Sequence, residues 1–217
     1  MYMKSHNKCG QLITFCGLDG CGKTTLIGLL KNSLEEMGYP VILTKQPTDA
    51  VRICEIFRNY MDNPNNDDFD YRALSLLTAS DRIQHSNKFI LPALEEGNIV
   101  ISDRYFYSCL ANLRARGYRH DSWIEEVAGF IPKPDLAFFL DVNVQTAVGR
   151  VRSRIEEKDR YIDMQLQYDL RNEYRTICKQ FGGIIYDSSD ESNKIFGKIM
   201  QDVMLRINQQ STISRAM

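Results

Sequence analysis

A glycine-rich segment near the start of the chain, residues 17–24, is the feature that most constrains what this sequence can fold into. It reads Gly-Leu-Asp-Gly-Cys-Gly-Lys-Thr and fits the pattern G-x-x-x-x-G-K-[ST], and the apolar residues 12–16 lead directly into it. Backbone N–H groups in such a loop turn toward a phosphate, and the helix that follows adds the partial positive charge of its N-terminus. We expect Lys23 to reach the β- and γ-phosphates and the Thr24 hydroxyl to ligate Mg²⁺. The sequence therefore predicts a nucleotide-binding protein.

The composition fits one folded domain with a substantial core. The chain has 217 residues, of which 43% are hydrophobic and 25% are charged. Its net charge of −1 argues against a nucleic-acid-binding surface, since such a surface needs a clustered excess of lysine and arginine. The six cysteines form no C-x-x-C pair, which is typical of reduced thiols. No apolar run approaches the roughly 20 residues that span a bilayer, so we expect a cytoplasmic protein with no membrane partner.

Apolar, β-rich runs alternate with amphipathic stretches along the chain, which indicates an α/β fold with a parallel sheet. After the glycine-rich loop, apolar residues recur every three or four positions as far as Met37, and Gly38 ends the predicted helix. These apolar side chains are expected to face the core. The five expected strands are residues 12–16, 41–44, 99–102, 136–141 and 184–186.

The remaining segments are assigned more coarsely. A long helix is expected over residues 71–95, preceded by a solvated polar turn at residues 62–68. Residues 1–10 and 209–217 are expected to be flexible tails. No internal repeat is found, so a single domain is predicted to span residues 1–217.

Charged residues follow the second and third predicted strands, at the sheet edge where open α/β folds bind ligands. Lys45 follows the second strand and is a candidate to hold the phosphate of an acceptor. Asp103 follows the third strand and is a candidate to accept a hydrogen bond from a substrate hydroxyl or from Mg²⁺-bound water. Its neighbour Arg104 offers a planar fork suited to a phosphate. A purely structural Asp–Arg pair is the alternative for these two residues.

Two further positions supply arginines. Arg82 lies on the long predicted helix, and the sequence allows either surface exposure or a place in the site. Residues 150–161 are dense in charge and are interpreted either as a solvated helix end or as a mobile segment that closes over a triphosphate. Closure would exclude water and offset the charge that builds on the transferring group. His6, His85 and His120 show no metal-ligand spacing, so we assign them no catalytic role.

Six short segments, in a fixed order along the chain, resemble one family when they are taken together. They are residues 17–25, Lys45-Gln46-Pro47, Ala79-Ser80-Asp81-Arg82, Asp103-Arg104-Tyr105, Pro132-Lys133-Pro134-Asp135 and Asp159-Arg160-Tyr161. With them the chain resembles the thymidylate kinase family from about Leu12 to Ile207. The resemblance implies a P-loop nucleoside monophosphate kinase fold, that is, a five-stranded parallel sheet flanked by helices, with a lid over ATP at residues 150–162. It also implies the reaction ATP + dTMP → ADP + dTDP with Mg²⁺, and commonly a homodimer.

The resemblance carries residue roles over by position. Asp19 would meet the acceptor's sugar hydroxyl or its phosphate region. Lys45 and Arg104 would hold the acceptor phosphate, and Arg82 would reach the pyrimidine edge. Arg150 looks like the family's residue beside the adenine. The donor nucleotide would be cradled by Gly17, Leu18, Asp19, Gly20, Cys21, Gly22, Lys23, Thr24 and Thr25, with Thr24 and Asp103 as the Mg²⁺ ligands.

A subtype is implied as well. Some members carry a catalytic arginine inside the P-loop, whereas this chain has Gly20 and Cys21 there. Arg152 and Arg154 in the lid are therefore expected to share catalysis with Asp19, Lys23 and Arg104. The role of Cys21 itself stays open. Gln46-Pro47, where the family usually has Glu-Pro, resembles the family's cis-proline turn.

Three departures from the family's pattern bear on the acceptor. Asn112, an expected substrate-binding residue, stands where many members place an aromatic ring that would crowd out a ribose 2′-hydroxyl. Thr78 stands where members often place a ring against the base, and Gln46 replaces a carboxylate. The acceptor could therefore be another pyrimidine nucleotide, ribo or deoxy. A deoxynucleoside is a further alternative, because residues 150–157 also resemble the lids of deoxynucleoside kinases. A P-loop switch protein is a third reading, but the sequence has no Asn-Lys-x-Asp motif.

Overall fold

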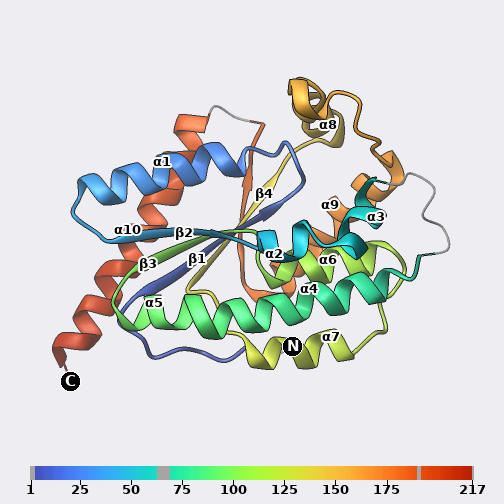
Figure 1. The fold of residues 1–217 in the computed structure, drawn as a ribbon. Coiled ribbons are helices and arrows are strands. Elements are labelled where there is room, and N and C mark those ends of the chain that lie inside the picture. The colour runs from blue at the N-terminus through green and yellow to red at the C-terminus, as the bar shows by residue number, and fades with distance from the viewer. Residues whose placement is uncertain (1–2, 63–68, 190–191, 217) are drawn as a thin grey trace.

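The computed structural model describes residues 3–62, 69–189 and 192–216, and helices and strands alternate along this part of the chain (Figure 1). In it, five strands form one sheet in the order β2-β3-β1-β4-β5, and each neighbouring pair is parallel. Parallel neighbours need crossover connections, which is why helices separate the strands in sequence. The predicted α/β fold is confirmed. The strands are β1 (Gln11–Gly17), β2 (Val41–Lys45), β3 (Ile99–Asp103), β4 (Leu136–Asp141) and β5 (Ile184–Asp187).

Helices cover both faces of the sheet (Figure 1). Helices α1 and α10 pack against each other on one face, whereas α4, α6 and α9 pack together on the other. None of the helices in the described residues is long and apolar enough to cross a membrane. The helices are α1 (Lys23–Glu36), α2 (Asp49–Arg52), α3 (Glu55–Asp62), α4 (Tyr71–His85), α5 (Leu91–Glu95), α6 (Phe106–Ala115), α7 (Trp123–Val127), α8 (Val144–Arg152), α9 (Met164–Phe181) and α10 (Ser192–Ala216).

The core is centred on β1, whose seven residues are all buried. A strand covered by helices on both faces is apolar on both faces, which explains its continuous hydrophobic run. The Phe15 and Phe138 rings meet there with their centroids 5.3 Å apart. The apolar stripe of α1 faces this core as expected, except for Met37, which is 55% exposed because the helix ends at Glu36.

Two segments differ from the sequence-based expectation, and a third is not described. The helix expected over residues 71–95 is interrupted by a π-helical turn, Ser86–Ile90, between α4 and α5. The tail expected from residue 209 begins inside α10, which continues to Ala216. The expected polar turn lies almost entirely outside the described residues, at residues 63–68.

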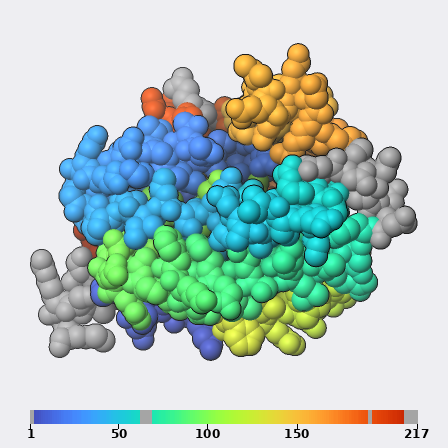
Figure 2. Space-filling model, in the orientation of Figure 1, coloured from blue at the N-terminus to red at the C-terminus, as the bar shows by residue number. Residues whose placement is uncertain are grey.

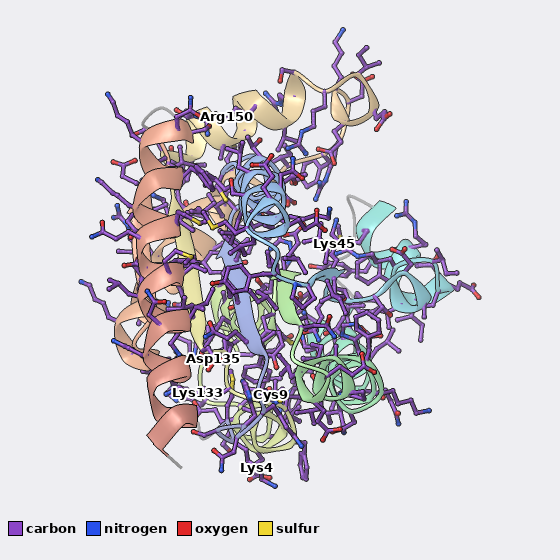
Figure 3. The ribbon with its side chains drawn as sticks, turned by 90° about the vertical axis from the view of Figure 1, so that its left-hand side faces the viewer. Lys4, Cys9, Lys45, Lys133, Asp135 and Arg150 are labelled. Atoms are coloured by element: carbon purple, nitrogen blue, oxygen red, sulfur yellow. The ribbon has the colours of Figure 1, made fainter. Side chains whose placement is uncertain are left out.

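The N-terminal segment, also expected as a tail, lies across the end of the sheet where the strands begin. Lys4 forms a bridge with Pro132, and the Gly10 N–H donates to the Leu94 carbonyl at 2.8 Å. Asp135 accepts hydrogen bonds there from His6, from the Leu12 N–H and from Arg206 at 2.7–2.8 Å. Burial alone would raise the pKa of Asp135, but these hydrogen bonds keep it below the ordinary value. Figure 3 shows Lys4 and Asp135 at the end of the molecule opposite Arg150.

Candidate active site

The glycine-rich loop joins β1 to α1, and its glycines are required by its shape. Gly17, Gly20 and Gly22 have φ angles of 141°, 81° and 95°, in the region that side chains rarely adopt. A Cβ at Gly17 would lie 2.5 Å from the Leu140 carbonyl oxygen, and one at Gly20 would overlap the Ala147 carbonyl oxygen. The loop is therefore wedged between β4 and α8, and only glycine fits at these contacts.

Lys23 places its ammonium group inside this loop. The residue is 6% exposed, and Nζ donates to the carbonyl oxygens of Gly17 at 3.1 Å and Leu18 at 2.8 Å. Nζ also lies 3.7 Å from Cys21 Sγ, so the buried thiol belongs to the wall of the lysine's pocket. Thr24 and Thr25 begin α1 beside it and are exposed.

An ion pair between Asp19 and Arg104 joins the loop to the end of β3. Arg104 Nη2 donates to Asp19 Oδ1 at 2.5 Å, and Nη1 donates to the Tyr174 hydroxyl at 3.1 Å. Arg104 has φ 68°, and its N–H donates to the Phe15 carbonyl at 2.9 Å, which aims the side chain across the loop. The Arg104 guanidinium holds the pKa of Asp19 well below its usual range. Asp19 is therefore ionised at physiological pH.

Strand register brings Lys45 and Asp103 side by side at the same edge. Lys45 Nζ lies 3.9 Å from Asp103 Oδ2, and the lysine side chain is 52% exposed. Asp103 Oδ1 is buried and has no hydrogen-bond partner among the described residues. A carboxylate oxygen without a partner suits a hard cation such as Mg²⁺, and the Thr24 hydroxyl, exposed at the start of α1, is the other predicted ligand. No group of three or more metal-ligating side chains occurs in residues 3–62, 69–189 and 192–216.

Helix α4 holds the chain on both sides of Lys45, from Thr44 to Thr48. Its His85 ring contacts Thr44 Oγ1 at 2.9 Å through Nε2 and Gln46 Nε2 at 3.1 Å through Nδ1. The expected cis peptide bond between Gln46 and Pro47 is present. Asp81 accepts from the Thr48 N–H at 2.8 Å and from its hydroxyl at 2.5 Å. These contacts give His85 a structural role.

Arg82 is buried on α4, which excludes the surface exposure that the sequence allowed for this residue. It is 3% exposed, and Nη1 donates to the Thr78 carbonyl at 2.8 Å. Its Nε is buried without a partner in the described part of the chain. Thr78 Oγ1 lies 3.6 Å from Cys109 Sγ, so α6 faces this part of α4. On α6, Asn112 donates to the Ser108 carbonyl, and its Oδ1 accepts from Arg116 at 2.8 Å.

The predicted lid, residues 150–162, runs from the end of α8 toward the start of α9. It projects from the molecule in Figure 2, where it is orange. Arg150 is fixed at its base, since its guanidinium donates to the carbonyl oxygens of Ser188 and Gly20 at 3.3–3.4 Å. Arg154 pairs with Glu157 at 3.2 Å, whereas Arg152 is exposed and makes no side-chain hydrogen bond among the described residues. A pocket of about 260 Å³ lies under the lid. It is lined by Gly20, Cys21, Gly22, Thr25, Leu26, Arg150, Arg154, Ser188, Ser192 and Ile195.

Helix α9, which follows the lid, is tied to the end of the sheet. Asp141, at the end of β4, accepts hydrogen bonds from Arg171 at 2.7 and 2.9 Å and from Arg175 at 2.6 and 3.1 Å. Both arginines belong to α9, which follows the lid. The strand that precedes α8 and the helix that follows the lid are thus fixed to each other.

Comparison with known proteins gives this arrangement its family. A family model for thymidylate kinase matches residues 15–207. The chain belongs to the thymidylate kinase family. It is 40% identical over 179 residues to the probable thymidylate kinase of Pyrococcus horikoshii, which covers 79% of this chain and 84% of that protein. It is 33% identical over 208 residues to the thymidylate kinase of Geobacillus sp., covering 91% of this chain and 98% of that protein.

The structure of this thymidylate kinase family member gathers most of the predicted site residues. Asp19, Lys23, Lys45, Asp103 and Arg104 meet around the loop, and Arg150 and Arg154 line the pocket under the lid. Arg82 and Asn112 belong to α4 and α6, and no hydrogen bond or ion pair within the described residues joins their side chains to that group.

Sequence reasoning missed two cations. In the lid, Arg160 Nη2 lies 3.4 Å from Asp19 Oδ2. The sequence indicated only that the Asp-Arg-Tyr segment around Arg160 resembles the family. Arg52, at the end of α2, carried no sequence signal, because a four-residue helix after a proline turn has no readable period.

The geometry of the glycines predicts that an alanine at Gly20 weakens ATP binding, whereas an alanine at Gly28 does not. We expect Gly20→Ala to weaken ATP binding at least tenfold, because the new Cβ would overlap the Ala147 carbonyl and the φ of 81° disfavours any side chain. The matched control is Gly28→Ala in the middle of α1, where a Cβ meets nothing within 4 Å. This change should leave ATP binding intact and raise the unfolding free energy by about 0.5–1 kcal/mol. Calorimetry with ATP and urea denaturation measure both; equal ATP affinity in the two variants would contradict the argument.

Proposed function

We propose that this chain transfers the γ-phosphoryl group of ATP to dTMP, giving ADP and dTDP. The observation that carries the proposal is the second set of charges around the loop. A phosphate-binding loop needs Lys23 and its backbone N–H groups for a donor, yet two further cations come from outside the loop, Arg104 beside Asp19 and Lys45 beside Asp103. Two cations there suit an acceptor that itself bears a phosphate. The names of the family and of its relatives supply thymidylate as that acceptor.

The donor half of the proposed site consists of residues 17–25 and the pocket under the lid. The backbone N–H groups of the loop and the N-terminus of α1 would hold the phosphates, with Lys23 at the β- and γ-positions. Arg150 would lie beside the adenine. Thr24 and Asp103 would hold Mg²⁺, which would offset the negative charge of the phosphates when it is bound.

The acceptor half faces it across Asp19. Lys45 and Arg104 would bind the acceptor phosphate, Arg82 the pyrimidine edge, and Asn112 the sugar. Because the pKa of Asp19 is far below its usual range, this carboxylate would orient a hydroxyl or an arginine and would not take up a proton. Catalysis then consists of alignment and charge stabilisation by Lys23, Arg104 and the lid arginines.

We further propose a cytoplasmic homodimer. All six cysteines are free thiols, which supports a reducing compartment. Ile53, Ile56 and Leu76, in or next to α2, α3 and α4, are at least half exposed, and a second copy of the chain would cover such side chains. Light scattering should give twice the 25.1 kDa of one chain. Leu76→Glu should shift that mass toward the monomer; a wild-type protein of single-chain mass would contradict the dimer.

The acceptor is tested by ADP release with dTMP, dUMP, dCMP, UMP and thymidine. We expect the highest kcat/KM for dTMP, because its phosphate meets Lys45 and Arg104 while thymidine offers no anion to them. Lys23→Ala should abolish transfer to every acceptor without changing the unfolding midpoint by more than a few degrees. Preference for thymidine over dTMP, or substantial turnover by Lys23→Ala, would refute the proposed function.

The lid arginines are tested by the double substitution Arg152→Ala with Arg154→Ala. We expect kcat to fall about 100-fold or more while KM for dTMP changes little, because these side chains would act on charge that develops during transfer. Lys158→Ala removes a charge of the same sign from the same exposed segment and should be neutral. If Arg160→Ala lowers kcat more than the double variant does, the catalytic role passes to Arg160, which already lies 3.4 Å from Asp19.

A further inference from the structure

Both ring nitrogens of His85 contact the end of β2, on either side of Lys45. Nε2 lies 2.9 Å from Thr44 Oγ1, and Nδ1 lies 3.1 Å from Gln46 Nε2. The Phe89 ring stacks on the imidazole, with the two centroids 5.2 Å apart. The imidazole thus joins the last residue of α4 to the strand that carries Lys45, which is labelled in Figure 3.

These contacts require the neutral form of the ring. An amide nitrogen can only donate, so Gln46 Nε2 donates a hydrogen bond to Nδ1, which must then carry no proton of its own. The ring proton accordingly lies on Nε2, which donates to the Thr44 hydroxyl. Burial lowers the pKa of His85, and the opposing effect of the Asp81 carboxylate is smaller. The ring is therefore neutral at physiological pH.

The surroundings of the ring hold little charge. Among the charged groups of the described residues, Asp81, one turn earlier on α4, is the one whose field acts on the ring. The side chains that contact the ring from β2 and from the π-helical turn, Thr44, Gln46 and Phe89, are uncharged. Lys45 lies between the two β2 contacts and points to the opposite side of the strand, because side chains alternate along a strand. Protonation of the ring would therefore change the local charge with only Asp81 to offset it.

A second proton on the ring would break the contact with Gln46. The Nδ1–H group and the amide nitrogen would then be two donors that face each other. The Gln46 side chain is fully buried, and its Oε1 has no hydrogen-bond partner within the described part of the chain. Its backbone N–H donates to the Asp103 carbonyl at 3.1 Å, and its carbonyl carbon forms the cis bond to Pro47. Loss of the side-chain contact therefore loosens the turn that directly follows Lys45.

We propose that His85 is a positioning residue of the acceptor site, whose neutral ring holds the end of β2 and the Gln46–Pro47 turn in the arrangement that binds the acceptor. Protonation of this ring weakens acceptor binding. The inference rests on the proposed function, which places Lys45 in the acceptor half of the site. No hydrogen bond within the described residues joins His85 to the donor loop, residues 17–25. Binding of ATP and the transfer step should therefore not respond to this proton.

The test measures kcat and the KM values for dTMP and ATP from about pH 5 to 8, in wild type and in His85→Asn. Asparagine does not titrate, and its oxygen can accept from the Gln46 amide as Nδ1 does. The KM for dTMP in wild type, divided by that of the variant, should rise about 3- to 10-fold toward the acid end, which corresponds to the loss of one hydrogen bond. Ionisation of the dTMP phosphate cancels in this ratio, because both proteins meet the same substrate. The ratios for kcat and for the KM of ATP should stay constant.

Gln46→Glu should move the effect in the opposite direction. An ionised carboxylate only accepts, so it would pair with the Nδ1–H of the protonated ring and raise the pKa of His85. The KM for dTMP of this variant should therefore rise less toward low pH than that of wild type. His120→Asn changes an exposed histidine after α6 and is the matched control, which should keep the wild-type pH profile.

A flip of the Gln46 amide is the competing response, because it would turn Oε1 toward the new Nδ1–H and keep the turn in place. In that case the KM ratio for dTMP between wild type and His85→Asn stays flat with pH, and this result overturns the proposal. An equal rise of the ratios for dTMP and ATP overturns it as well, since it would show a general loss of structure. If His85→Asn does not fold, Gln46→Glu decides, and a wild-type profile in that variant rejects the role.

Failure of the proposed function looks different, because wild type would then phosphorylate no dTMP at any pH. NMR titration of the wild-type protein is the probe in that case. The backbone amide signals of Gln46 and Thr48 should shift with the same midpoint as the His85 ring. Amide signals that do not follow this midpoint reject the role of His85.

Discussion

The ion pair between Asp19 and Arg104 is the interaction on which the site depends. It crosses from the glycine-rich loop to the end of β3, and the backbone of Arg104 is bonded to Phe15 in the central strand. Its geometry requires an unusual φ of 68° at a residue that is not glycine, which is tolerated only where surrounding contacts fix it. The glycine-rich loop and the end of β3 are consequently held at one distance by the sheet itself.

This pair also sets the electrostatic character of the site. Asp19 stays ionised because Arg104 lies against one of its oxygens, and Arg160 of the lid lies 3.4 Å from the other. Lys45 lies beside a second carboxylate, that of Asp103. Under the proposed function, the phosphates of two molecules would meet charges that the protein already holds in place. Since phosphoryl transfer needs little covalent chemistry from the protein, such placement of charge is much of what the fold would provide.

The sequence predicted the elements that depend on local pattern, and it failed where distant contacts decide. The five strands and the glycine-rich loop are periodic or compositional features, and Lys45, Asp103 and Arg104 were found because parallel strands end at one edge. The cis Gln46–Pro47 bond came from resemblance and is present. The π-helical turn at Ser86–Ile90 was missed because the pattern of apolar residues continues through it. Arg52 and Arg160 were missed because their places are fixed by a proline turn and by the fold of the lid, neither of which has a period.

The contact between Gly20 and the Ala147 carbonyl limits how the lid can work. Through this contact the middle of α8 packs directly against the loop. One turn later, Arg150 donates hydrogen bonds to the carbonyl oxygens of Gly20 and Ser188. Asp141 fixes α9 on the other side. Any hinge must therefore lie after Arg150 and before α9, a segment shorter than the whole charged region. Under the proposed function, the wall of the pocket at Arg150 would stay in place while the arginines beyond it move, so the adenine end of the site would keep its shape when the lid opens.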